Sequence, residues 1–396
     1  MAGANVTHLN FGDWPGRIIS GRDATSRLAE VMQSLGASRA MVICGSTVQR
    51  TDMLGRVEAG LGTRIASVFA EAKPHTPVEM VERGLAQFRS AKADALVTVG
   101  GGSAIDAGKA IAVMLATGGD LTSYEISYRP GGEMQHRPIA GKPPVHIAIP
   151  TTAGSASDVM PTAGCRDPAT RRKMLFWDDK LTPDASILDP AMAVHMSPGL
   201  TAATGMTAMA RAVESLYSAN RHPISTGLAL HAIRLLRTAL PAALADPRDL
   251  DARAACQMAS TMSGMAAINA MVSVVHAIGH VVGGRYGLQH GTSHTILLPA
   301  AMRLLLAAIG ADQRLVLDAL GATASSADGN AAADAAADLM GAFVRRLPMP
   351  VRLRDVEVGE TELPEIAHLT MSDYMMANLP RPMPETEVLS LLREAW

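Results

Sequence analysis

The sequence predicts an α/β domain with a parallel sheet over residues 1–190, followed by an all-α domain over residues 191–396. In the first half, short β-branched runs alternate with helical stretches, a pattern typical of a parallel sheet covered by helices on both faces. After about residue 190 the chain is rich in Ala, Leu and Met, which is typical of stacked helices. A chain of 396 residues is long enough for two such domains.

The elements are expected in the following order. Four apolar runs predict buried strands, at residues 39–44, 65–70, 95–103 and 145–152. Residues 76–93, between the second and third runs, predict a helix. Pro190 and Pro198 lie within residues 185–199, which we interpret as the boundary between the domains. Three helices are then expected, over residues 200–219, 224–245 and 253–272, and we expect the Met residues of this part of the chain to fill the core.

The composition excludes several classes of protein. Hydrophobic residues make up 48% of the chain and charged residues 18%, which is the balance of a globular protein and not of a disordered one. The net charge is −2 and no long run has a single sign, so neither nucleic acid nor an anionic membrane is an expected partner.

The location of the protein is also predicted from the sequence. Its start lacks a basic segment followed by an apolar one, and no window holds about eighteen uninterrupted apolar residues, so we expect no signal peptide and no transmembrane helix. Cys44, Cys165 and Cys256 form neither a CxxC pair nor a zinc-binding spacing. We expect each to be a small buried hydrophobic residue in a cytoplasmic protein.

The segment VTVGGGSAIDAGKA follows a predicted strand and opens a predicted helix. Gly100, Gly101 and Gly102 would let a ligand approach the backbone closely, and the helix beginning near Ser103 would offer free N–H groups to a phosphate. The motif is not G-x-G-x-x-G, so the usual Rossmann pattern is absent. A tight turn without a ligand is the alternative.

A second polar loop, IPTTAGSASDV over residues 149–159, also follows a strand. It carries hydroxyl groups on Thr151, Thr152, Ser155 and Ser157. These hydroxyls could cap a helix or form a turn, or they could contact a cofactor. Because ligands bind at the carboxyl ends of the strands in open α/β sheets, the two loops together favour a ligand site.

The segment HAIGHVVGGRYGLQH holds three histidines, His276, His280 and His290, and His294 follows. Three histidines could bind zinc without other ligands, so a histidine-only metal site is one interpretation. A histidine with an ordinary pKa near 6.5 is also suited to proton transfer. We expect His294 and His195 to be structural.

Five segments occur in the order and spacing of the iron-containing (group III) alcohol dehydrogenase superfamily, which the chain resembles over most of its length: GGGSAIDAGKA, IPTTAGSASDV, RKMLFWDDKLTPDASILDP, LTAATGMTAMARAVESLYS and HAIGHVVGGRYGLQHGTSHTILLP. The resemblance implies a dehydroquinate synthase-like fold, with an N-terminal dinucleotide-binding domain, a helical domain and a cleft between them. It also implies hydride transfer with NADH or NADPH, and a homodimer. Within the superfamily, LQHGTSHTILLP and LLREAW are most similar to maleylacetate reductases.

The resemblance also assigns residues. Those implied to contact the cofactor lie in the two polar loops and at one lysine further along the chain: Gly101, Gly102, Ser103, Asp106, Thr151, Thr152, Ser155 and Lys173. The histidine at position 280 is implied to lie near the nicotinamide and to relay a proton.

One helix motif departs from the metal-dependent members of the superfamily. There it reads G-M-D-A-x-x-H, and its Asp and His bind the metal with two histidines that match His276 and His290. Here it reads GMTAMAR, so Thr207 stands at the Asp position and Arg211 at the His position.

The replacement changes the chemistry of the site. A Thr hydroxyl is a poor ligand and a guanidinium has no lone pair to offer. The two changes make the site more positive by two units, so a dication would be repelled, and each pair of unit charges costs about 4 kcal/mol at about 4 Å and an effective dielectric near 20. We therefore expect no metal. Arg211 could instead polarise a carbonyl oxygen or hold a substrate carboxylate, or it could form an ion pair with Glu214 on its own helix.

These observations predict an NAD(P)H-dependent, metal-independent reductase that transfers hydride to a carbonyl, or to a double bond conjugated with one, in a small oxo acid. Arg211 would bind the acceptor, His280 would supply a proton, and His276 and His290 would complete the catalytic pocket. The alternatives are a metal-dependent alcohol dehydrogenase with altered ligands and a non-redox dinucleotide-binding protein. No carboxylate follows the strand that ends at Cys44 and Gly45, and Arg50 is near, so NADPH is allowed beside NADH.

Overall fold

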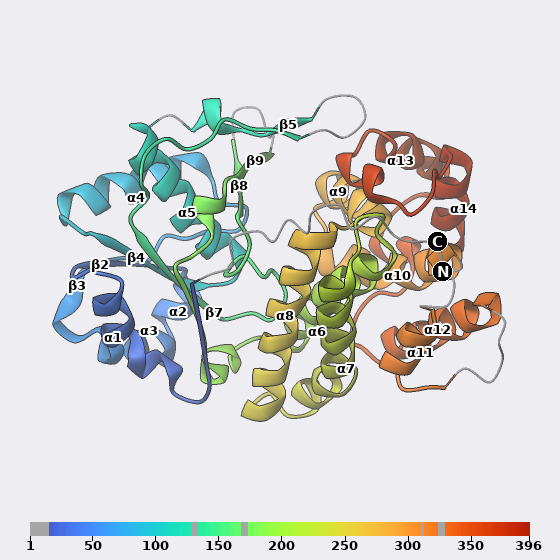
Figure 1. The fold of residues 1–396 in the computed structure, drawn as a ribbon, viewed down its shortest axis with the longest axis horizontal. Helices are drawn as coiled ribbons and strands as arrows, with labels where there is room; N and C mark the ends of the chain where they lie inside the picture. The colour runs from blue at the N-terminus through green and yellow to red at the C-terminus, as the bar shows by residue number, and fades with distance from the viewer. Residues whose placement is uncertain are drawn as a thin grey trace.

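The computed structural model describes residues 16–119, 121–128, 134–167, 173–306, 308–309, 313–323 and 329–396. An α/β domain and a helical domain lie side by side (Figure 1). The predicted fold class is confirmed, because the first half forms a parallel sheet and the second half is almost entirely helical.

The main sheet has six parallel strands in the order β1-β10-β7-β4-β2-β3. Their bounds are β1 Arg17–Ser20, β2 Ala40–Cys44, β3 Ile65–Phe69, β4 Ala95–Gly100, β7 Val145–Pro150 and β10 Ala185–Leu188. Two short antiparallel pairs lie outside this sheet, formed by β5 Ser127–Tyr128 with β6 Met134–Gln135 and by β8 Thr162–Arg166 with β9 Lys173–Trp177. The four predicted apolar runs therefore form the centre and one edge of the sheet.

The run 95–103 is a strand only as far as Gly100, because helix α5 begins at Gly102. The first four residues of the segment 185–199 form β10, which is buried along its whole length between β1 and β7 and was not predicted as a strand. β1 was not predicted, and it is a short edge strand that is mostly exposed.

Helices cover both faces of the sheet. The side chains of Met41 and Ile43 in β2 face the cluster that contains α4 (Val78–Ser90) and α5 (Gly102–Thr117). Val42 and Cys44, which alternate with them, face the cluster formed with α1 (Leu28–Ser34) and α3 (Asp52–Leu61). The short helix α2 (Ser46–Gln49) follows β2. This two-sided burial explains why the strands are largely apolar.

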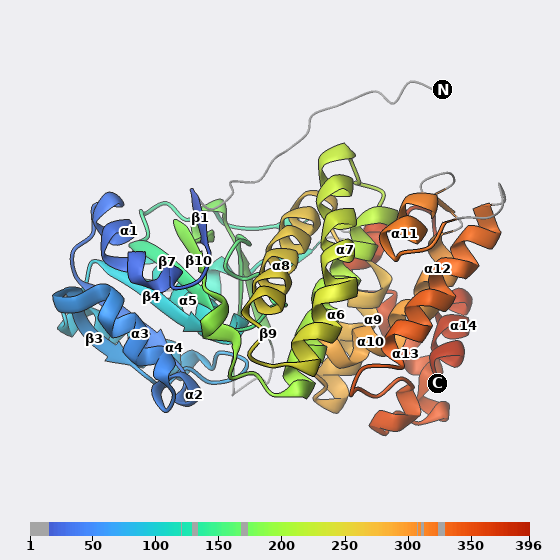
Figure 2. The ribbon, with the colours of Figure 1, turned by 90° about the horizontal axis from the view of Figure 1, so that it is seen from below.

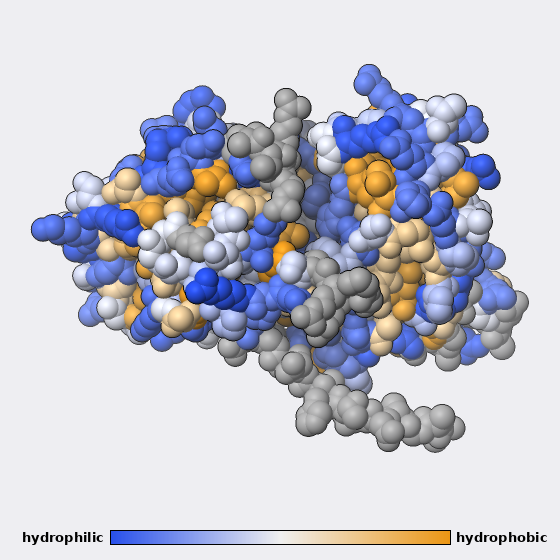
Figure 3. All heavy atoms as spheres, turned by 90° about the horizontal axis from the view of Figure 1, so that it is seen from above, coloured by the Kyte–Doolittle hydropathy of each residue, from blue (hydrophilic) through white to orange (hydrophobic). Residues whose placement is uncertain are grey.

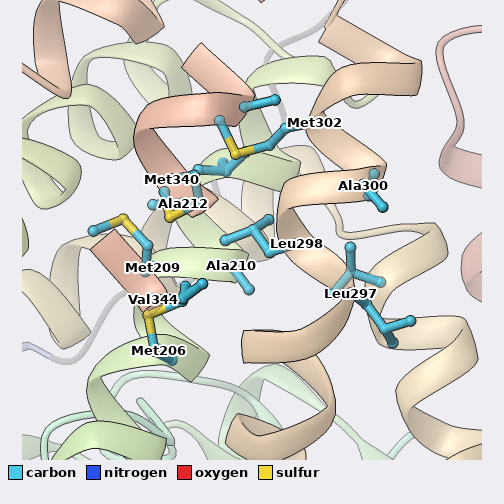
Figure 4. Close-up of a cluster of buried hydrophobic side chains, with 14 of the residues drawn as sticks. Met206, Met209, Ala210, Ala212, Leu297, Leu298, Ala300, Met302, Met340 and Val344 are labelled. Atoms are coloured by element: carbon cyan, nitrogen blue, oxygen red, sulfur yellow. The ribbon is translucent and has the colours of Figure 1, made fainter. Parts of the chain in front are cut away.

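The helical domain has its own core. Its helices are α6 Pro198–Tyr217, α7 Pro223–Ala245, α8 Leu250–Ala270, α9 Val274–Tyr286, α10 His290–Leu305, α11 Gln313–Ala319, α12 Gly329–Val344, α13 Leu363–Thr370 and α14 Glu385–Ala395. Methionines from α6, α10 and α12 meet in this core (Figure 4), which confirms that Met acts here as filling: Met206, Met209, Met302 and Met340. By length and composition alone α7 could cross a membrane, but it packs along α6 and α8 as a core helix does.

The two domains meet where α6 and α8 approach the sheet. Figure 2 shows α8 next to the sheet and α12 on the side of the helical domain away from the sheet. At Gly154, in the loop after β7, a Cβ atom would overlap the carbonyl oxygen of Thr204 in α6. The second polar loop therefore packs closely against α6 of the helical domain. On the face seen in Figure 3, the surface is hollowed between the domains.

Candidate active site

The glycine loop joins β4 to α5. Gly100 has φ +155°, and Gly101 precedes the helix with no side chain capping it. The first turn of α5 carries no acidic residue, so the positive end of a 16-residue helix is left available to an anion. These are the features expected of a phosphate site.

The two polar loops touch each other. A Cβ atom at Gly101 would lie 3.3 Å from Cγ2 of Thr152, and one at Gly102 would lie 2.9 Å from Cβ of Ser155. The backbone N–H of Thr151 donates to the carbonyl of Gly100 (3.0 Å). The glycines therefore form a narrow cradle, with the hydroxyl-bearing loop as its other wall.

This cradle yields a testable prediction. Gly101→Ala should weaken dinucleotide affinity about 10-fold, because the new methyl group would narrow the passage to the helix N-terminus. Gly55→Ala in α3 is the matched control, since a Cβ atom there meets nothing within 4 Å. Fluorescence titration with NADH and NADPH measures both variants. Equal affinities for the two folded variants would mean that the loop does not bind the cofactor.

Two of the residues implied to contact the cofactor, Ser103 and Asp106, have other partners. The Oγ atom of Ser103 accepts the backbone N–H of His75 (3.3 Å). Asp106 accepts hydrogen bonds from the hydroxyl of Ser157 (2.6 Å) and the backbone N–H of Gly164 (3.1 Å), so it anchors the second loop to α5. Lys173 begins β9, and its side chain lies outside the described part of the structure.

Arg211 is buried where the helical domain meets the second loop. Its Nη2 donates to the carbonyl oxygen of Ser155 (3.1 Å) and its Nη1 to Oγ of Ser263 (3.4 Å). Burial lowers the pKa of Arg211 to about 10, an effect that the carboxylates of Asp158 and Glu214 oppose. The guanidinium is therefore charged at neutral pH. These two hydrogen bonds use part of its five N–H donors, so it has donors left for an anionic ligand.

Glu214 does not form the ion pair that was the alternative for Arg211. This fully buried carboxylate accepts the backbone N–H groups of Ser273 (3.2 Å) and Val275 (2.9 Å), and it is hydrogen-bonded to Nδ1 of His276. No salt bridge joins Arg211 to Glu214 among the described residues. Glu214 instead fixes the orientation of the His276 ring, which leaves Nε2 as the nitrogen available to the site.

His280 is held by a residue that the sequence did not point to. Its Nδ1 lies 2.8 Å from Oδ2 of Asp373, which is 93 residues away in the chain and whose other oxygen accepts the backbone N–H of Met375. The side chain of His280 is 29% exposed, so it can exchange protons with solvent. Its ring lies 5.7 Å from that of His290 and 6.1 Å from that of Tyr374. A carboxylate-oriented histidine of this kind is suited to proton transfer.

The four histidines form a chain of neighbouring rings. His294 lies between His276 (4.1 Å between ring centroids) and His290 (5.8 Å). His294 is almost fully buried, and its ring nitrogens have no hydrogen-bond partner among the described residues. Burial, reinforced by the neighbouring histidines and Arg211, lowers the pKa of His294 well below its ordinary value. His195 pairs with Asp52 (2.6 Å) in a half-exposed contact and takes no part in this cluster.

The residues at the superfamily's metal position do not fit a metal ion. Thr207 donates its hydroxyl to the carbonyl of Ala203 (3.0 Å) in its own helix. Arg211 brings a buried positive charge, and within the described ranges no three His, Cys, Asp or Glu side chains are arranged as ligands. The donor set therefore lacks anionic oxygen and repels a dication.

The chain resembles known proteins along almost all of its length. The family model for iron-containing alcohol dehydrogenase matches residues 15–190, and the model for the C-terminal part of the Fe-containing alcohol dehydrogenase family matches residues 201–396. The 1,3-propanediol dehydrogenase of Klebsiella pneumoniae is 33% identical, covering 95% of this chain and 96% of that protein. The NAD-dependent methanol dehydrogenase of Bacillus methanolicus is 30% identical, covering 98% and 99%.

Solved structures have the same fold. A 1,3-propanediol oxidoreductase superimposes with a TM-score of 0.91 at 30% identity, covering 98% of this chain and 100% of that one. The maleylacetate reductase of Agrobacterium tumefaciens has a TM-score of 0.81 at 27% identity, covering 99% of each chain. Together with the two family models, these similarities show that the chain is an oxidoreductase and belongs to the iron-containing alcohol dehydrogenase family.

Proposed function

We propose that this protein is a nicotinamide-dependent reductase that acts on a small oxo acid without a resident metal ion. The observation that carries the proposal is the buried guanidinium of Arg211, which lies beside the second polar loop and near the histidine cluster. A fixed positive charge there takes the place of a Lewis acid in polarising a carbonyl, and it also recognises a carboxylate.

The two loops after β4 and β7 would hold the dinucleotide. The N-terminus of α5 and the backbone at Gly101 and Gly102 are available to its phosphates, and Thr151, Thr152 and Ser155 line the opposite wall. When bound, the reduced nicotinamide supplies the hydride. β2 ends at Cys44 and Gly45 follows without a carboxylate, so no charge there repels a 2′-phosphate, and we propose that the protein accepts NADPH as well as NADH.

The acceptor would lie between Arg211 and His280. Arg211 would hold a carboxylate or the carbonyl oxygen in a fork of N–H donors. Asp373 fixes the His280 ring through Nδ1, so Nε2 is the atom that would give a proton to the reduced product. The partial exposure of His280 then allows the proton to be replaced from solvent.

A maleylacetate-like oxo acid is the acceptor that we propose within this class. Its carboxylates match the charge of Arg211, and two maleylacetate reductases of known structure, at 27% and 28% identity, share the fold over 99% of their chains. We also propose that the protein is a cytoplasmic homodimer, which light scattering in solution tests.

The purified protein is expected to contain no stoichiometric Fe or Zn and to keep its activity in the presence of a chelator. The reason is that Thr207 and Arg211 provide neither an anionic ligand nor a neutral nitrogen. Elemental analysis, combined with rates before and after treatment with EDTA, is the measurement. Activity that disappears with EDTA and returns with Zn²⁺ or Fe²⁺ would establish a metal-dependent dehydrogenase with altered ligands.

The reaction itself is tested by following oxidation of NADH and NADPH against a panel of oxo acids and matched aldehydes. We expect oxo acids to be reduced with a higher kcat/KM than aldehydes of the same length, because only the acids can pair with Arg211. Dinucleotide binding without turnover of any carbonyl compound would favour a non-redox protein and contradict the proposal.

A further inference from the structure

Beneath the second polar loop lies a buried ammonium group. Lys109, in α5, has no solvent-exposed surface, and its Nζ contacts four oxygen atoms. These are the carbonyl oxygens of Ser157 (2.5 Å), Met160 (2.6 Å) and Thr162 (2.8 Å), and the hydroxyl of Ser157 (3.1 Å). The ammonium is therefore enclosed by the chain that runs from the loop after β7 to the first residue of β8, as a small cation would be in a cage of oxygens.

The buried charge is tolerated because its surroundings are polar. Asp106 and Asp158 lie close enough to favour the charged form, against the cost of burial, which lowers the pKa of Lys109 to about 8. Removing one member of such a network leaves the remaining buried polar groups unpaired, which is costly. Here those groups would be three carbonyl oxygens that face inward from one loop.

The loop that encloses Lys109 also forms both parts of the proposed site. Ser155 packs against Gly102 in the phosphate cradle, and its carbonyl oxygen accepts Nη2 of Arg211. The backbone N–H of Ser157 donates to Oγ of Ser155 (3.3 Å), and the hydroxyl of Ser157 donates to Asp106 (2.6 Å). A hydrogen-bonded path therefore runs from the ammonium to the cofactor wall and to the acceptor-binding arginine.

We propose that Lys109 is a positioning residue for the reaction: by gathering the carbonyls of residues 157, 160 and 162, it sets the position of Ser155 and so places the cofactor wall relative to Arg211. This inference rests on the proposed dinucleotide-dependent function. Lys109 touches neither the cofactor nor the acceptor, and it acts only through the loop.

The test compares Lys109→Met with Lys180→Met. Methionine keeps the length and apolar stem of lysine but donates no hydrogen bond. Lys180 is the matched control, because its ammonium also donates to backbone carbonyls, those of Ile139 and Gly141, at a different loop of the same domain. Dissociation constants for NADPH and NADH are measured by fluorescence titration well below the melting temperature of each variant, with Tm recorded separately.

We expect Lys109→Met to weaken dinucleotide affinity about 10-fold, since small displacements of a binding group cost this much or more. Lys180→Met should leave the affinity unchanged. Hydrogen exchange should become faster at the amides of residues 155–164 in the Lys109 variant alone. If Lys109→Met does not fold, Lys109→Gln, which keeps two donors without the charge, should show an intermediate loss.

A folded Lys109 variant with lower Tm but wild-type affinity would overturn the inference, because a merely structural lysine changes stability alone. That result differs from failure of the proposed function, in which the wild-type protein itself would bind no dinucleotide.

Discussion

Arg211→Ala is expected to lower turnover about 100-fold, because losing a preorganised charged donor costs on the order of 3 kcal/mol in the transition state. In the structure this side chain is buried against the second loop, and it anchors Ser155 through its carbonyl oxygen. Arg211→Lys should recover only part of the rate, since an ammonium lacks the planar fork that binds a carboxylate through two hydrogen bonds. Steady-state kinetics with an oxo acid give the measurement.

Loss of the arginine also removes packing, so two further variants separate charge from volume. Arg211→Met keeps the length of the side chain and should be as slow as the alanine variant. Arg253→Met is the matched control, because Arg253 is equally buried but bonds Thr201 (2.9 Å) and the carbonyl of Pro247 (3.1 Å). We expect it to lower stability and leave the rate per folded molecule intact. Near wild-type turnover in Arg211→Met would show that the guanidinium has no role in the chemistry.

The double change Thr207→Asp with Arg211→His is expected to create a metal site that the natural protein lacks. It adds an anionic oxygen and a neutral imidazole beside His276 and His290 while removing a positive charge. The Nδ1 atom of His276 is already held by Glu214, so Nε2 is the nitrogen free to bind a metal. Calorimetric titration should find about one equivalent of Zn²⁺ or Fe²⁺ bound, as expected for a four-ligand site.

Two further variants show which residues are needed for metal binding. Thr207→Asp alone should bind no metal, because the new carboxylate would pair with Arg211. Adding His276→Ala to the double variant should abolish binding, since one of the ligands is then lost. Tight binding of Zn²⁺ or Fe²⁺ by the unmodified protein would contradict the argument that the positive charge of Arg211 keeps a dication out of the site.

The strands and helices could be predicted because their signals are local. Largely apolar runs mark β2, β3, β4 and β7, whereas the short β1 and β10 were missed because four residues carry little periodicity. The glycine loop and the hydroxyl-bearing loop could be predicted for the same reason, since each directly follows a strand.

Some features of the site could likewise be predicted from the sequence, whereas others could not. The motif GMTAMAR can be read directly from the sequence, and the resemblance to the superfamily implies that Thr207 and Arg211 stand at two metal-ligand positions. Neither residue type is a suitable ligand. The partners of the site residues are visible only in the folded protein: Arg211 bonds Ser155 rather than Glu214, Glu214 orients His276, and Asp373 orients His280.

The physical reason is separation along the chain. These contacts join residues 56, 62 and 93 positions apart, and side-chain hydrogen bonds at such distances depend on how helices pack, which no local pattern encodes. The cage around Lys109 is a similar case, because its lysine lies on α5 and its carbonyl oxygens come from backbone about fifty residues later, where any residue type supplies the same atom.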